Sequence, residues 1–173
     1  MTENINTKVL LTVLILGCFL STLNQTLLNV ALSNFMDVFS VSATTVQWLA
    51  TGFMLVNGVL VPITAYLMKR FSTRQLFMSS MLFLLIGSIL CAVAPTFSVL
   101  LIGRMIQAVG AGIIMPLLMT VVMFVFPSEK RGSMMGMIGL AMIFAPAIAP
   151  TLAGFIIDYT SWRWLFIGLI PRP

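Results

Sequence analysis

The side chains in this sequence that could do chemistry are few, and most lie inside long apolar runs. The 173 residues include no histidine, and their four acids are Glu3, Asp37, Glu129 and Asp158. The two cysteines show no disulfide or metal-ligand pattern. We therefore expect no enzymatic activity, no cofactor and no bound metal. What remains is hydrogen bonding by amides and hydroxyls, together with one arginine in an otherwise apolar segment.

Arg104 is the most informative of these residues, because it lies about eight residues past the turn at Ala94–Thr96. An arginine near the centre of a membrane helix costs roughly 2.5–3.5 kcal/mol on insertion scales, so it should face other helices and have a partner. Gln107 could orient the guanidinium, and Gly110 and Gly112 would let a neighbouring backbone come close. The alternative is an arginine whose side chain extends to the outer interface.

Polar residues in the first apolar run recur every four positions. They are Gly17, Ser21, Gln25 and Asn29, with Asn24 beside them. That spacing places them on one face of a helix. The face either binds a neighbouring helix through hydrogen bonds or lines a substrate cavity. A shorter version of the pattern in the second run consists of Gln47, Thr51, Asn57 and Gly58.

The fifth apolar run carries two neighbouring rows of small residues and prolines. One row is Ala141, Ala145, Ala149 and Ala153, and the row beside it is Pro146, Pro150 and Gly154. Proline removes an amide donor, so we expect this helix to bend. The smooth face should pack tightly against another helix. Such a helix is either a hinge or seal, or simply a close-packed structural element.

Composition indicates which elements must hold these residues. The chain is 60% hydrophobic and 8% charged, with a mean hydropathy of +1.13, whereas soluble domains carry about 25% charged residues. The nine basic residues form no patch of the kind that nucleic acid requires. We therefore expect an all-α integral membrane protein with the lipid bilayer, and no nucleic acid, as its partner.

The uncharged runs are long enough for helices of about 20 residues, which can cross a bilayer because they satisfy their own backbone groups. The spans expected are about 9–32, 46–67, 76–94, 97–125 and 133–157. A sixth span begins near Trp164 and is truncated at residue 173. The sequence thus predicts five full membrane helices and the start of a sixth.

Basic residues lie mainly in every second segment that connects these spans. If the N-terminus is cytoplasmic, the inner segments hold Lys8, Lys69, Arg70, Arg74, Lys130 and Arg131. Only Arg163 then lies at the outer boundary. Cytoplasmic loops carry an excess of lysine and arginine. The sequence therefore predicts a multi-pass protein of the plasma membrane with its N-terminus in the cytoplasm.

Motifs in the same order along the chain resemble the major facilitator superfamily, specifically the fourteen-span EmrB/QacA-type multidrug efflux branch and its lincomycin-resistance type. The matching segments are residues 24–32 in the first span, Gln47-Trp48, the basic gate loop 65–74, Arg-x-x-Gln at 104–107 running on to Gly110, the antiporter motif 145–154, and Trp-x-Trp-x-Phe at 162–166. Several positions depart from the family pattern, three of them at residues expected to have a role or beside such a residue. Asn24 stands where an aspartate is common, Lys69 replaces the gate aspartate, and Ala108 replaces a glycine.

The resemblance implies an exporter of small amphipathic drugs that is driven by protons and works by alternating access. It implies a cavity lined by Gln25, Asn29, Gln47 and Asn57, a gate loop with Lys69, Arg70 and Arg74, and a bend set by Pro146 and Pro150. Arg104 would sense a coupled carboxylate, because a nearby cation shifts the pKa of an acid. No carboxylate lies within the spans, so the remaining, missing transporter half would supply it. The alternative is a truncated membrane fragment that transports nothing.

Overall fold

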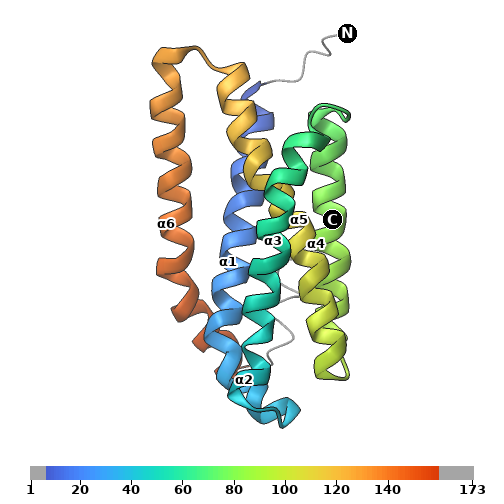
Figure 1. The fold of residues 1–173 in the computed structure, drawn as a ribbon. Coiled ribbons are helices and arrows are strands. Elements are labelled where there is room, and N and C mark those ends of the chain that lie inside the picture. The colour runs from blue at the N-terminus through green and yellow to red at the C-terminus, as the bar shows by residue number, and fades with distance from the viewer. Residues whose placement is uncertain (1–6, 160–173) are drawn as a thin grey trace.

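The computed structural model describes residues 7–159 (Figure 1), and the side-chain surroundings of residues 12–156. Apart from short connections, this part of the chain is helical, and it contains no strand. Its helices are α1 (Thr7–Phe39), α2 (Ala43–Val46), α3 (Trp48–Leu67), α4 (Thr73–Ala92), α5 (Phe97–Val125) and α6 (Ser128–Tyr159).

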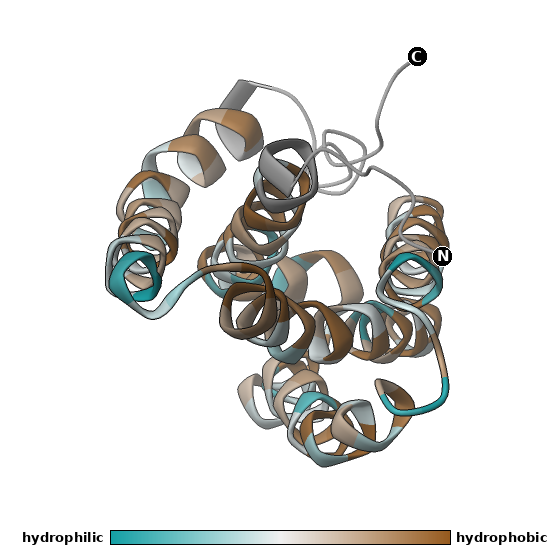
Figure 2. Ribbon diagram, turned by 90° about the horizontal axis from the view of Figure 1, so that it is seen from above, coloured by the Kyte–Doolittle hydropathy of each residue, from teal (hydrophilic) through white to brown (hydrophobic). Residues whose placement is uncertain are grey.

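Five segments in the described region are long and apolar enough to cross a membrane: Thr12–Phe39, Ala43–Leu67, Thr73–Ala92, Phe97–Val125 and Ser128–Ile156. The all-α membrane architecture expected from composition is therefore confirmed. Figure 2 shows hydrophilic residues mainly near the ends of helices and in the loops, while apolar residues make up most of the helical ribbon. The sixth span expected at 164–173 lies outside the described residues.

The first helix is longer at its C-terminal end than the uncharged run suggested. It continues from residue 32 to Phe39 and ends where Ser40 adopts a left-handed conformation with φ of 50°. The Val41 amide then donates to the Met36 carbonyl at 3.2 Å, which closes the last turn. Glycine is the usual residue at such a position, so this end carried no clear signal in the sequence.

The start of α4 is set by a capping box. The Gln75 amide donates to Ser72 Oγ at 3.3 Å, and the Ser72 amide donates to Gln75 Oε1 at 3.0 Å. These two bonds satisfy backbone donors that the first turn of a helix leaves free. They fix the point at which the basic loop after α3 ends and α4 begins.

Helix α5 is the centre of the bundle and packs against α1, α3 and α4 (Figure 1). Glycines make the contact with α4 possible. A Cβ atom at Gly110 would lie 2.5 Å from the Ser80 carbonyl oxygen, and one at Gly87 would lie 2.7 Å from the Gly103 carbonyl oxygen. On the other side, Thr64 of α3 donates to the Gly112 carbonyl at 3.3 Å. The small residues of α5 therefore allow direct approach of helix backbones.

Helix α6 packs chiefly against α1 through its alanine row. Ala145, Ala149 and Ala153 are fully buried, and the last two belong to a cluster with Leu27 and Leu28 of α1. The neighbouring row behaves differently, since Pro146 and Pro150 are exposed. A Cβ atom at Gly154 would meet nothing within 4 Å.

Gly154 therefore makes no close contact with another described helix, and its expected part in a hinge or in packing stays a prediction. The four-residue alanine row faces α1, and the proline row is turned away from it. Figure 1 shows that α6 changes direction in its second half, towards the α2 end of the bundle. The bend lies in the part of the helix that carries the prolines.

The two basic loops lie at the same end of the bundle (Figure 1). The α3–α4 connection carries Lys69 and Arg70, and the start of α6 carries Lys130 and Arg131. The opposite end holds the α1–α2 and α4–α5 connections, with Asp37 in the last turn of α1. The fold thus separates the described basic loops from the acidic end of α1.

Candidate functional site

Arg104 lies at the centre of the bundle, and none of its surface is exposed. Its Nη1 donates to Asn24 Oδ1 on α1 at 2.6 Å and to Gln107 Oε1 on α5 at 2.9 Å. Its Cζ lies 4.5 Å from the centre of the Phe53 ring on α3. A ring at this distance attracts a guanidinium electrostatically. The side chain therefore points into the protein and does not extend to an interface.

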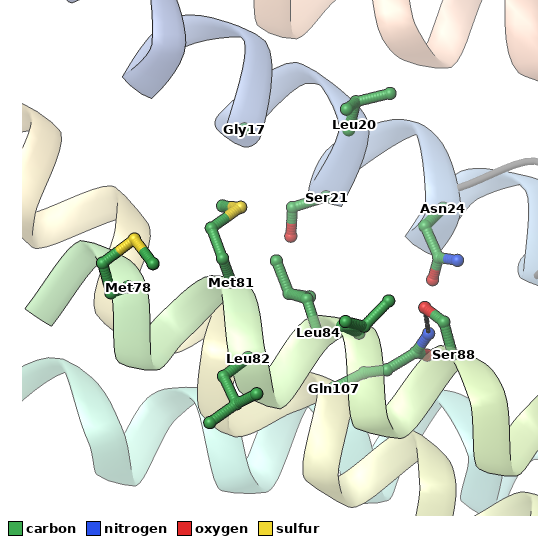
Figure 3. Close-up of a pocket in the computed structure, with 11 residues that line it drawn as sticks. Gly17, Leu20, Ser21, Asn24, Met78, Met81, Leu82, Leu84, Ser88 and Gln107 are labelled. Carbon is green, nitrogen blue, oxygen red and sulfur yellow. Dashed lines mark hydrogen bonds between the residues drawn. The ribbon is translucent and has the colours of Figure 1, made fainter. Parts of the chain in front are cut away.

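The network continues from α5 to α4 through Gln107. Its Nε2 donates to Ser88 Oγ at 2.8 Å (Figure 3). Ser88 and Gln107 are both buried. Four side chains thus link three helices in the order Asn24, Arg104, Gln107 and Ser88, which we call the Arg104 network.

Two members of this environment, Ser88 and Phe53, were not found by the sequence reasoning. Ser88 is one of several serines in α4, and no spacing distinguishes it. Phe53 is one of 13 phenylalanines, and its contact with Arg104 depends on how α3 packs against α5. The distinguishing signal is tertiary in both cases.

The guanidinium keeps unused hydrogen-bonding capacity. Its Nε and Nη2 are buried and have no hydrogen-bond partner among the described residues. Arginine binds carboxylates through two parallel N–H groups, but here its hydrogen-bond partners among the described side chains are amide oxygens. Because Asn24 and Gln107 are both neutral, the network contains a positive charge and no described negative charge.

A cavity of about 260 Å³ lies between α1 and α4, beside the Arg104 network (Figure 3). Most of its wall consists of leucine and methionine side chains. Its polar residues are Ser21, Asn24, Ser88 and Gln107. Ligand sites commonly combine an apolar wall with a few polar groups, and this cavity has both features.

The other residues expected to line a cavity are elsewhere. Asn29 and Gln47 are exposed, and Gln25 and Asn57 are half-buried. An α-helix has 3.6 residues per turn, so positions four apart drift by about 40° at each step. Gly17 at the start of the row lies against Met81 of α4. By Asn29 the row has turned to an open face of α1.

That open face carries a stripe of neutral polar residues, which we call the α1 stripe. Its members, all half-buried or exposed, are Thr22, Gln25, Thr26, Asn29 and Ser33. Two of the hydroxyls bond within the helix, since Thr22 donates to the Cys18 carbonyl and Thr26 to the Thr22 carbonyl, both at 3.0 Å. The amides of Gln25 and Asn29 remain on the open face.

The residues expected to form a gate loop do not join the Arg104 network. Lys69, Arg70 and Arg74 are exposed at the basic end of the bundle. Arg70 lies over the ring of Tyr66, with its Cζ 5.5 Å from the ring centre. The loop is therefore a separate surface feature.

Comparison with known proteins identifies the family. The model of the Major Facilitator Superfamily matches residues 14–171. The chain belongs to this superfamily. Two solved transporters have the same fold. A D-xylose–proton symporter gives a TM-score of 0.74 at 17% identity, covering 93% of this chain and 44% of its own. A bacterial homologue of the human lysosomal transporter Spinster gives 0.75 at 19% identity, covering 97% and 42%.

Curated relatives are closer in sequence. An uncharacterized MFS-type transporter of Bacillus subtilis is 56% identical over 166 residues, which are 96% of this chain and 31% of that protein. The lincomycin resistance protein of B. subtilis is 43% identical over 158 residues, 91% of this chain and 33% of its own. The multidrug export protein EmrB of Haemophilus influenzae is 34% identical over 156 residues, 90% and 31%. The chain thus spans about a third of the length of these relatives.

Proposed function

We propose that this chain forms the first helices of a proton-driven exporter of small amphipathic drugs that works by alternating access. The observation that carries the proposal is the 43% identity with a lincomycin resistance protein over 91% of the chain. Because the chain spans a third of that relative, transport is proposed for the longer protein that contains it.

The α1 stripe supports a drug-binding role. It combines amides that both donate and accept hydrogen bonds with apolar residues on the same helix. Gln47 and Thr51 extend this character to the exposed face of the second span. An amphipathic drug needs both kinds of contact, so these faces suit the wall of a transport cavity.

The charges of the described helices support a structural role for these helices and a proton-carrying role for the rest of the exporter. Asp37 and Glu129 are exposed near helix ends, and neither is a candidate for a buried proton carrier. The titrating carboxylate is therefore proposed to belong to the other bundle. The Arg104 network would hold α1, α4 and α5 in register while the two bundles move.

The positions of the basic loops support an orientation of the protein in the membrane. Lys69, Arg70, Lys130 and Arg131 share one end of the bundle (Figure 1), and an excess of basic residues is typical of cytoplasmic loops. We place this end, and with it the N-terminus, in the cytoplasm. The protein would be a multi-pass component of the plasma membrane.

The experiment is transport into inside-out membrane vesicles that contain the full-length exporter. With an acidic interior, the vesicles should accumulate lincomycin, and nigericin, which collapses the pH gradient, should abolish accumulation. Equal accumulation with and without the gradient would contradict proton coupling. No accumulation of lincomycin or of other amphipathic drugs would contradict the export function.

A parallel preparation containing only the 173 residues tests the fragment interpretation. The proposal expects no gradient-dependent uptake from these residues alone. In the full-length exporter, Arg104→Ala should reduce transport strongly at normal expression, whereas Arg70→Ala in the gate loop should reduce it less. Unchanged transport by Arg104→Ala would make Arg104 a structural residue only.

A further inference from the structure

Helix α3 reaches the Arg104 network through an aromatic ring. The guanidinium is bonded to Asn24 of α1 and to Gln107 of its own helix, and Gln107 continues to Ser88 of α4. Among the described residues, α3 offers the guanidinium no hydrogen bond. It contributes Phe53 instead, and Cζ of Arg104 lies over this ring, 4.5 Å from its centre. The ring is therefore the described link between α3 and the buried charge.

We propose that Phe53 is a positioning residue, whose ring holds the Arg104 guanidinium in the orientation that transport requires. The inference rests on the proposed export function and adds a residue to the machinery that serves it. Phe53 is only 3% exposed, so its ring acts on Arg104 and has almost no surface to offer a drug. Its role should therefore be visible in the rate of transport and not in the affinity for the drug.

The hydrogen bonds of Arg104 leave the orientation of its guanidinium incompletely fixed. Both bonds to described side chains involve Nη1, with lengths of 2.6 and 2.9 Å. Nε and Nη2 are buried and have no hydrogen-bond partner among the described residues. A flat group that is bonded through one nitrogen can still tilt about that nitrogen. An aromatic face attracts the guanidinium as a whole and favours stacking on it, so Phe53 supplies a constraint that the hydrogen bonds lack.

The ring is itself held firmly between α3 and α5. Phe53 belongs to a buried cluster with Ala108 and Ala111 of α5. Beside it, a Cβ atom at Gly52 would lie 3.2 Å from Cε of Met105 on α5. Small residues on both helices permit this close approach. Phe53 therefore provides a fixed support, because the packing of α3 against α5 determines where its ring lies.

Burial makes the attraction between this ring and this cation strong. No surface of Arg104 is exposed, and salt screens buried charges much less than exposed ones. A desolvated contact between a cation and an aromatic face changes an equilibrium constant by roughly thirtyfold. The attraction comes from the negative potential at the ring face, so it depends on the electrons of the ring as well as on its shape. A change in the electrons alone can therefore separate positioning from packing.

Ring fluorination provides that change, because fluorine withdraws electrons from the ring face and alters the shape of the ring little. Phenylalanines that carry one, two or three ring fluorines are incorporated in place of Phe53 in the full-length exporter. Lincomycin uptake driven by a pH gradient is measured in inside-out vesicles, which gives a maximal rate per exporter and a KM for each variant. We expect the maximal rate to fall with each fluorine, by about tenfold in total, while KM stays within about twofold.

The matched control is the same fluorine series at Phe77 of α4. This ring is half-buried and packs against the cluster that contains Leu14 and Ile114. No described cation lies over its face. Fluorines at Phe77 therefore test the effect of size and hydrophobicity alone, and they should leave the maximal rate within about twofold of the wild type.

A second measurement covers the case in which the fluorinated chains do not fold. Phe53→Leu keeps a large apolar side chain and removes the ring face. Its effect on the Tm of the full-length exporter is compared in the wild type and in Arg104→Gln, because a double-mutant cycle isolates the interaction between two side chains. Phe53→Leu should lower Tm by several degrees more when Arg104 is present. Equal decreases in Tm would overturn the inference.

The other outcomes separate the inference from the proposed function. An equal maximal rate across the Phe53 series, or a similar fall in the Phe77 series, would overturn the positioning role and leave drug export intact. A change mainly in KM would overturn it as well, because it would indicate contact between Phe53 and the drug. If the wild type took up no tested amphipathic drug in response to the gradient, the proposed function would be overturned, and the transport role of Phe53 with it.

Discussion

Gly110 and Gly154 provide a matched test of how closely the helices approach each other. Both are helical glycines in small-residue patterns, and both become alanine by the addition of one methyl group. At Gly110 that methyl would lie 2.5 Å from the Ser80 carbonyl oxygen and 3.0 Å from the Leu84 amide nitrogen. At Gly154 it would meet nothing within 4 Å. The two substitutions therefore differ in packing and share the change in helix propensity.

The expected free energies follow from these contacts. Alanine stabilises a helix interior by about 1 kcal/mol relative to glycine. Adding a methyl group to a closely packed site costs about 1–3 kcal/mol, and the atoms that would have to move at Gly110 include backbone atoms of α4. Gly154→Ala should thus be stabilising by up to about 1 kcal/mol. Gly110→Ala should be less stable than Gly154→Ala by about 1–3 kcal/mol.

Thermal unfolding of the full-length exporter in detergent would measure this difference. A thiol-reactive dye is a suitable probe, because Cys18 and Cys91 are buried free thiols that unfolding exposes. At roughly 2–4 °C per kcal/mol, Gly110→Ala should have a Tm several degrees below that of Gly154→Ala. Equal Tm values, or a higher Tm for Gly110→Ala, would refute the close backbone contact between α4 and α5.

Three further substitutions test other features of the bundle, and one cysteine tests its topology. Ser88→Ala should destabilise the protein by about 1–3 kcal/mol, because it leaves a buried amide N–H without its partner; exposed Ser79→Ala should have little effect on Tm. Ser72→Ala removes the capping box and should cost about 1 kcal/mol of stability. Pro146→Ala restores an amide donor within α6 and should slow transport without lowering Tm; unchanged transport would favour a purely structural helix. A cysteine in place of Lys130 should react with an impermeant maleimide only after permeabilisation, and labelling of intact cells would contradict the proposed topology.

The sequence predicted the helices well because lipid leaves few alternatives. An uncharged run in a bilayer must be helical, so the limits of α5 at Phe97 and Val125 agree with the expected range. The errors lie at ends where charge does not mark the boundary. The first helix extends past residue 32 to Phe39. The residue that ends it is Ser40, and not the glycine that usually marks such an end. The capping box at the start of α4 corresponds to a Ser-x-x-Gln pattern at Ser72 and Gln75, which marks this helix end in the sequence.

The site was less predictable, because spacing gives the face of a helix but not the neighbour that it meets. Arg104 and Gln107 were identified from their spacing, and their contact lies within one helix. The bond to Asn24 spans 80 positions and depends on how α1 packs against α5. Ser88 and Phe53 had no distinguishing pattern. The four-residue row from Gly17 to Asn29 was read as one face, although its drift around the helix divides it between two environments.

That division explains how α1 can contribute to two kinds of interaction. Successive residues of a helix point about 100° apart, so Asn24 can bond to buried Arg104 while Gln25 lies on the half-buried stripe. Neither residue could have both roles, because a side chain that is hydrogen-bonded within the Arg104 network is not accessible to a ligand. The order Asn24-Gln25 therefore places a structural hydrogen bond and a potential ligand contact on the same turn. A movement of α1 that broke the 2.6 Å bond to Arg104 would also displace the amide of Gln25.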